Sequence, residues 1–182
     1  MKVVAVPLLA LAACTQAPEA TNTAQPAGES KAAPAKMVSA PEAKSPTKTY
    51  ADATAAYNSF ARAAGALAKE KASRPAVRKY ADMIYKEHLE FGMTFKLAAA
   101  RVPGLLPNPT LSAEQQANLA TLQKASGAAF DQAFVAQQLA AHQEMLPVQR
   151  AYGQTGEEDA LKDYADRYSR WVQRHLRLGK EL

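Results

Sequence analysis

The chain contains a single cysteine, Cys14, among its 182 residues. One thiol cannot form an internal disulfide, and without a Cys-x-x-Cys-His motif no c-type haem can be attached. The eight glycines form neither a phosphate-binding loop nor a Gly-x-Ser-x-Gly nucleophile elbow. These absences exclude a disulfide-stapled fold and leave nucleophilic catalysis without support, so we expect no catalytic residues.

Long apolar runs are also absent. The longest, residues 3–13, is interrupted by Pro7 and is far shorter than the roughly 20 apolar residues of a membrane-spanning helix. Lys2 gives it the positive start of an export signal, which predicts a signal peptide over residues 1–13.

The signal ends in Leu11-Ala12-Ala13-Cys14. This tetrapeptide resembles the lipobox of bacterial lipoproteins, in which two small residues suit the peptidase and the cysteine sulfur carries diacylglycerol. Lipidation would also account for an otherwise unused thiol in an oxidising compartment. The resemblance implies a membrane anchor at Cys14. Because Thr15, and not Asp, follows the cysteine, it implies the periplasmic face of the outer membrane.

Residues 14–49 are rich in Ala, Pro, Thr, Ser, Glu and Lys, and Met37 and Val38 are their only large apolar residues. Such a segment buries too little apolar surface to offset its ordering entropy. We therefore predict a disordered tether over 14–49 and one folded domain over 50–182.

The predicted domain carries 17 Lys and Arg against 14 Asp and Glu, without a basic run. This charge balance argues against nucleic acid as a partner and leaves a periplasmic protein as the candidate partner.

The domain lacks the β-branched runs that mark strands, and four segments have a helical period. The last is the clearest, with apolar or aromatic residues and one histidine at steps of three or four: Leu161, Tyr164, Tyr168, Trp171, His175, Leu178 and Leu182. Trp171 is expected in the core. Pro75 suits the first turn of the second helix, which should stop before Pro103.

A long connection separates the second and third long helices. It holds the capping-box pattern Ser112-Ala113-Glu114-Gln115, which predicts a short helix before a break at Gly127. A turn is expected over residues 153–156. Four long helices with one crossover predict an all-α, ferritin-like four-helix bundle with a short extra helix in the crossover.

Several motifs occur in a fixed order along the domain: Lys71-Ala72-Ser73-Arg74-Pro75-Ala76-Val77, Glu87-His88, Ser126-Gly127-Ala128-Ala129-Phe130-Asp131, His142-Gln143 and His175-Leu176. Over residues 51–182 this pattern resembles the DUF4142 family, which implies an exported ferritin-like bundle and no settled function. The family tends to have an acidic residue in the first helix, where this chain has Ala61 and Ala63.

The three histidines of the chain, His88, His142 and His175, each lie on the apolar stripe of a different long helix. Asp131 lies eleven residues before His142 and therefore on the same face. Imidazoles inside a bundle suit Zn²⁺, Cu²⁺ or iron. The candidate metal ligands are thus His88, His142, His175 and Asp131. The interpretation that the sequence favours is buried structural pairs, such as His88 or His142 with a neighbouring acid or tyrosine.

Helix rise gives an expected separation of these residues. Placing the turn at residues 153–156 puts His175 on the order of 8–12 Å from the level of His88 and His142. This predicts two separate polar pairs in preference to one three-histidine site. The Glu-x-x-His motif of di-iron oxidases is missing, because Tyr85, Leu139 and Val172 stand three residues before the histidines.

Three functions follow from these features. The anchor, the tether and the lack of catalytic motifs favour a non-enzymatic envelope interaction or stress-related module. The histidines support the alternative, a metal-binding module. A ferritin-like oxidase is the least supported.

Overall fold

The computed structural model describes residues 44–182, which form five α-helices and, within that range, no strand. The helices are α1 (Pro46–Lys71), α2 (Pro75–Ala99), α3 (Ala113–Lys124), α4 (Gly127–Thr155) and α5 (Asp159–Lys180). The all-α prediction is confirmed. The predicted signal peptide, the lipidated Cys14 and most of the predicted tether lie outside the described residues.

Helix α1 begins earlier than the sequence predicted. The side chain of Ser45 accepts a hydrogen bond from the backbone N–H of Lys48 at 3.2 Å, and Pro46 occupies the first turn. Ser at the N-cap followed by Pro is a strong helix start. Residues 46–49, which composition assigned to the tether, therefore belong to the bundle.

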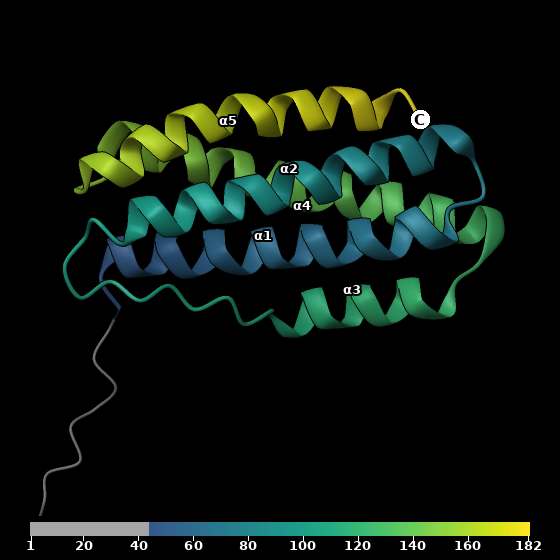
Figure 1. Cartoon of the computed structure of the whole chain (residues 1–182), viewed down its shortest axis with the longest axis horizontal. Helices are drawn as coiled ribbons and strands as arrows, with labels where there is room; N and C mark the ends of the chain where they lie inside the picture. The colour runs from purple at the N-terminus through teal and green to yellow at the C-terminus, as the bar shows by residue number, and fades with distance from the viewer. Residues whose placement is uncertain (1–43) are drawn as a thin grey trace, which may run out of the picture. The chain divides into compact units, whose positions relative to one another are not determined.

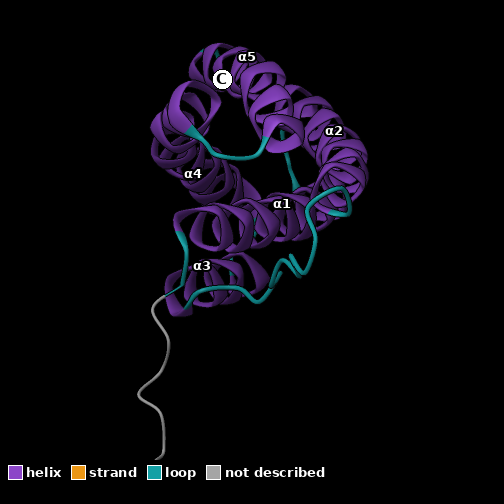
Figure 2. Cartoon of the chain, turned by 90° about the vertical axis from the view of Figure 1, so that its left-hand side faces the viewer, coloured by secondary structure: helices purple, strands orange, loops and turns teal. Residues whose placement is uncertain are grey.

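The four long helices form an antiparallel bundle (Figures 1 and 2). α1 packs on α2 and α4 packs on α5, while α2 also contacts α5 and α1 also contacts α4. The crossover lets α4 run in the same direction as α2, so all four contacting pairs are antiparallel (Figure 1). This is the ferritin-like arrangement predicted from the long connection.

The crossover carries α3, which packs on the outside of α1 and α4 (Figure 2). The predicted capping box is present: the Ser112 hydroxyl accepts from the backbone of Gln115 at 3.1 Å, and the Gln115 side chain accepts from the backbone of Ser112 at 3.0 Å. Leu122 fixes the helix to the bundle and is fully buried.

Two helix ends decide where the site residues lie. α4 begins at Gly127, whose φ of 56° lies in the left-handed region that favours glycine. At its other end α4 continues through Pro147 and Gly153 to Thr155, with Gly156 as its cap. The turn expected at 153–156 is therefore shorter and later than predicted.

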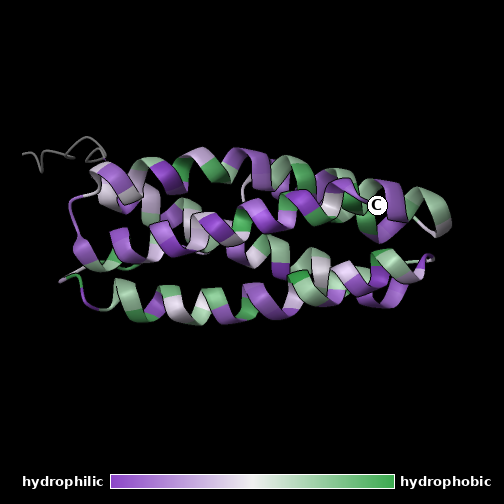
Figure 3. Ribbon diagram, turned by 90° about the horizontal axis from the view of Figure 1, so that it is seen from above, coloured by the Kyte–Doolittle hydropathy of each residue, from purple (hydrophilic) through white to green (hydrophobic). Residues whose placement is uncertain are grey.

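The core consists of two apolar clusters on either side of a polar layer. One contains Tyr57, Phe95 and Tyr168, and the other contains Ile84 and Phe134. Hydrophobic and hydrophilic residues are interspersed along the helices (Figure 3). The polar layer, formed by the three histidines, separates the two clusters, because each histidine lies between them on its own helix.

Trp171 differs from its predicted place in the core, since its side chain is 40% exposed. It lies against Phe91, with the guanidinium of Arg174 5.2 Å from its ring centroid. In the described part of the chain, no helix is both long enough and apolar enough to cross a membrane.

Candidate metal centre

The three histidines meet at the middle of the bundle. His88 comes from α2, His142 from α4 and His175 from α5, and each is at most 1% exposed. One ring nitrogen from each lies within 4.8 Å of the others. The sequence-based preference for two separate polar pairs is therefore wrong.

The helix ends explain this correction. His142 lies thirteen residues before the end of α4, and His175 lies sixteen residues after the start of α5. A difference of three residues is only about 4.5 Å of helix rise, which side chains span easily. The estimate of 8–12 Å came from ending α4 too early, at Gly153.

The rings of His142 and His175 face each other, and the outer nitrogen of each ring faces an oxygen acceptor. His142 Nδ1 donates to the backbone carbonyl of Gln138 at 2.6 Å, and His142 Nε2 lies 2.9 Å from His175 Nδ1. His175 Nε2 lies 2.7 Å from a carboxylate oxygen of Glu87, whose other oxygen accepts from Arg174 at 2.6 Å. Because a carbonyl and a carboxylate accept only, the outer nitrogen of each ring carries a hydrogen.

His88 is oriented by a second polar group. Its Nδ1 lies 2.9 Å from Asn58 Oδ1, and the hydroxyl of Tyr168 donates to the same oxygen at 2.9 Å. Asn58 Nδ2 donates to the hydroxyl of Tyr164 at 3.2 Å, which fixes the orientation of the amide. His88 Nδ1 therefore carries the hydrogen, and its lone pair is on Nε2.

Burial keeps two of the rings neutral. It lowers the pKa of His88 well below the ordinary value, and the neighbouring His142 and His175 lower it further. Burial, together with His175, lowers the pKa of His142 to about 3. Partial burial opposes ionisation of Glu87, but hydrogen bonds from His175 and Arg174 outweigh it and hold the pKa of that carboxyl below its usual range.

The interior beside the histidines contains polar atoms without partners. Within residues 44–182, His88 Nε2 and both side-chain polar atoms of Gln138 are buried and make no hydrogen bond. Gln138 is one turn before His142 on α4 and is fully buried. Because leaving a buried polar atom unpaired costs free energy, a bound group that pairs with these atoms would stabilise the interior.

Asp131 does not join the histidines. Its carboxylate accepts hydrogen bonds from the backbone N–H groups of Ser73 and Arg74, at 2.9 and 2.8 Å, and from the Ser73 hydroxyl at 2.7 Å. These donors, which outweigh the effect of burial, lower its pKa. Asp131 therefore caps the start of α2 and ties the α1–α2 connection to α4.

The sequence did not identify Asn58 as a partner of His88. It lies on a face of α1 whose other buried residues are small: Ala51, Thr54, Ala61, Gly65 and Ala68. The sequence did contain one signal for it, because Asn58 is an amide that falls at helical spacing among these small residues. In the sequence Glu87 stands out only as part of the Glu87-His88 motif, because its contact with His175 depends on how α2 and α5 pack.

The geometry gives this cluster three nitrogen donors that could hold a metal ion. Comparison with known proteins adds the family but no activity. Residues 32–182 match the family described as a domain of unknown function, DUF4142. Neither the curated proteins nor the solved structures contain a match. The match extends over most of the chain and includes all five helices, so the chain belongs to the DUF4142 family.

Proposed function

We propose that this bundle is a metal-binding module that holds a divalent transition-metal ion on His88, His142 and His175. The observation that carries the proposal is their convergence from three helices, with one nitrogen of each within 4.8 Å of the others. Histidines packed only for structure would have both ring nitrogens paired, whereas His88 Nε2 has no partner among the described residues.

The hydrogen bonds around the rings select the ligand atoms. The outer nitrogens, His88 Nδ1, His142 Nδ1 and His175 Nε2, each face an oxygen acceptor. Metal-binding histidines usually donate their second nitrogen to a carboxylate, carbonyl or similar acceptor, which fixes the tautomer and the ring orientation. This leaves His88 Nε2, His142 Nε2 and His175 Nδ1 as the inner atoms that would bind the ion.

The distances fit an ion of ordinary size. Zn–N bonds are about 2.0–2.1 Å long, so two nitrogens of one tetrahedral site lie about 3.3 Å apart. The inner pair of His142 and His175 is 2.9 Å apart, and all three ligand atoms fall within 4.8 Å. Side-chain shifts on the order of 1 Å would bring the three nitrogens to bonding distance from one ion, and such shifts require no movement of the helices.

The donor set selects the kind of metal. Three imidazoles suit Zn²⁺ or Cu²⁺, whereas Mg²⁺ and Ca²⁺ take oxygen ligands. An oxidase with a carboxylate-bridged iron pair has no support, because the residues three before each histidine are Tyr85, Leu139 and Val172. The geometry therefore favours the metal-binding alternative over the interaction module that the sequence alone favoured.

The location of this module is part of the proposal. The export signal and the Leu-Ala-Ala-Cys sequence support lipidation at Cys14 and an anchor on the periplasmic face of the outer membrane. Residues 15–43 would then connect the anchor to the bundle. A metal site held near a membrane in this way suits capture or buffering of an ion in the envelope.

The test uses the full-length chain, stripped with EDTA and melted with and without Zn²⁺, Cu²⁺ and Mg²⁺. A ligand that binds only the folded state adds about 2.7 kcal/mol of stability at a hundredfold excess over its Kd. We expect a clear rise of Tm with Zn²⁺ or Cu²⁺ and none with Mg²⁺. His88→Gln and His142→Gln should abolish the rise, and the Cu²⁺ electron paramagnetic resonance spectrum should show nitrogen coupling that weakens in either variant.

Asp131→Ala is the matched control. It removes three capping hydrogen bonds and should lower stability by about 1–2 kcal/mol, while leaving the metal-dependent rise of Tm intact. The proposal is overturned if no transition metal raises Tm, or if the rise persists in both histidine variants.

A further inference from the structure

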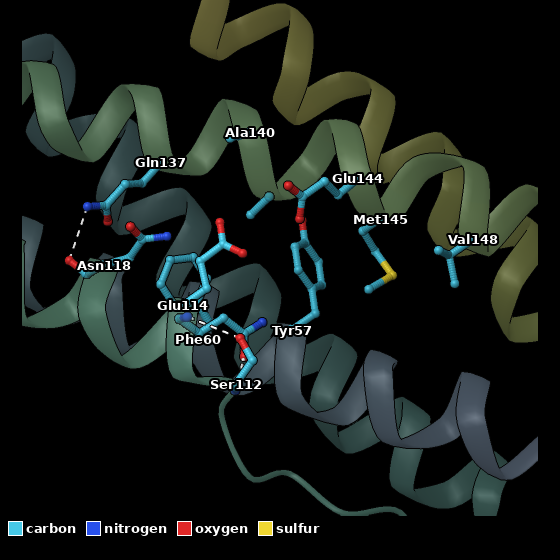
Figure 4. Close-up of a pocket in the computed structure, with 12 residues that line it drawn as sticks. Tyr57, Phe60, Ser112, Glu114, Asn118, Gln137, Ala140, Glu144, Met145 and Val148 are labelled. Carbon is cyan, nitrogen blue, oxygen red and sulfur yellow. Dashed lines mark hydrogen bonds between the residues drawn. The ribbon is translucent and has the colours of Figure 1, made fainter. Parts of the chain in front are cut away.

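A second candidate site lies on the other side of Tyr57 from the histidines. The ring of Tyr57 contacts His88 and His142 edge-on, with centroids 5.3 and 5.5 Å away. Its hydroxyl end lines a pocket of about 220 Å³ between α1, α3 and α4 (Figure 4). This is below the roughly 300–1,000 Å³ of sites for drug-sized ligands, so the pocket suits a molecule of a few heavy atoms.

The buried base of the pocket has polar atoms without partners. Tyr57 is 2% exposed, yet its hydroxyl makes no hydrogen bond within residues 44–182. Gln137 Nε2 donates to the backbone carbonyl of Asn118 at 3.0 Å, but the buried Gln137 Oε1 accepts nothing from these residues. Both unpaired atoms can accept a hydrogen bond. Burying a hydroxyl without a hydrogen-bond partner lowers the stability of the fold, and a bound donor would remove that cost.

The rim of the pocket has charge of one sign. The exposed carboxylates of Glu114, from α3, and Glu144, from α4, face the pocket from opposite walls (Figure 4). No lysine or arginine lines it, and neither carboxylate forms an ion pair within the described part of the chain. The pocket therefore offers an excess of acceptors and negative charge.

Apolar side chains line part of the remaining wall, beside the polar side chains of Ser112, Gln115 and Asn118. The rings of Tyr57 and Phe60 and the side chains of Met145 and Val148 line the interior below the carboxylates. An ammonium group supplies three donors and a charge that is attracted to aromatic faces. A hydrated Mg²⁺ or Ca²⁺ ion, in contrast, gains nothing from apolar walls, because it binds through oxygen ligands.

We infer that this pocket binds a small organic cation, a primary ammonium on a short aliphatic stem. The ammonium group lies between Glu114 and Glu144, and the stem lies against Tyr57 and Phe60. The three N–H groups of the ammonium donate to the two carboxylates and to the Tyr57 hydroxyl. The inference stands without a metal at the histidines, because none of these residues is among the proposed metal ligands.

The test titrates the full-length chain with n-butylammonium and follows amide signals by nuclear magnetic resonance, including the side-chain NH₂ groups of Gln137 and Asn118. The neutral n-butanol, the anionic butyrate and Mg²⁺ are titrated in parallel. We expect saturable shifts of the two side-chain signals with n-butylammonium alone. Glu144→Gln and Glu114→Gln should each weaken binding about tenfold, and Glu90→Gln, an exposed control on α2, should leave it unchanged.

Tyr57→Phe separates a binding role from a structural one. Removing an unpaired buried hydroxyl should leave Tm unchanged or raise it, yet weaken n-butylammonium binding several-fold. The inference is overturned if n-butanol binds as well as the cation, if Mg²⁺ produces the same shifts, if the glutamate variants bind normally, or if no saturable shift occurs.

Discussion

At the scale of single residues, the centre of the bundle is organised by acceptors placed outside the histidine rings. Oxygen atoms of Asn58, the Gln138 carbonyl and Glu87 each lie within hydrogen-bonding distance of one nitrogen of a histidine ring. The other nitrogen of each ring is thereby directed toward the middle of the bundle. Because each ring is fully buried, its orientation is set by these partners and not by solvent. The site is thus preorganised before any ligand enters.

Burial of these rings predicts how stability depends on pH. The pKa values of His88 and His142 are lower in the folded state than the ordinary value of 6.5, the second at about 3. Below pH 6.5 the unfolded chain takes up protons that the folded chain does not, so unfolding becomes easier. His142 faces His88, His175 and Tyr57. Glu87, also with a lowered pKa, adds to the loss only near and below pH 4.5.

We expect the urea midpoint of the EDTA-treated chain to be highest at pH 7 and above and to fall steadily between pH 6.5 and 5. His142→Gln should unfold at lower urea but with a flatter pH profile, because it removes one of the groups that titrate. A midpoint that stays constant between pH 7 and 5 would contradict neutral buried rings.

At the scale of elements, α1 and α2 approach each other so closely that one glycine becomes necessary. A Cβ on Gly65 would lie 3.0 Å from the backbone nitrogen of Tyr85 and 3.2 Å from the carbonyl oxygen of Ala81. Backbone atoms of a packed helix cannot move aside independently. Asn58 and His88, which come from the same two helices, meet at 2.9 Å because the helices are this close.

Gly65→Ala should therefore destabilise the bundle by about 1–3 kcal/mol, even though alanine is the better helix former. Gly92→Ala on α2 is the matched control, since a Cβ there meets nothing within 4 Å. That variant should gain about 0.5–1 kcal/mol from helix propensity. Urea unfolding of both variants measures the difference, and a stabilised Gly65→Ala would show that the two helices can move apart without cost.

At the scale of the whole molecule, the proposed anchor decides where the bundle works. Acyl chains on Cys14 would give stable membrane attachment, because two or more chains hold a protein far more firmly than one. Expressed in a two-membrane bacterium with labelled palmitate, the chain should incorporate label and fractionate with the outer membrane. Cys14→Ser should incorporate none and appear in the soluble periplasmic fraction. Unlabelled wild-type protein would remove the anchor from the proposal.

The sequence by itself determined the helices and their connectivity. Apolar spacing, Pro75, Gly127 and the capping box at Ser112 are local signals, and local signals act within one or two turns. The long crossover was enough to predict the ferritin-like arrangement. The candidate histidines were also evident, since they interrupt apolar stripes.

Only the tertiary structure decided what those histidines do together. A shift of two or three residues in the α4–α5 turn lengthens α4 and shortens α5 together. It therefore changes the height of His175 relative to His142 by about 6–9 Å, which decides between one three-histidine site and two separate pairs. Asp131, equally plausible by spacing, caps α2 instead, because its partners at residues 73 and 74 come from a connection distant in sequence. Convergence depends on helix ends and on packing between helices, and neither is contained in the period of any single helix.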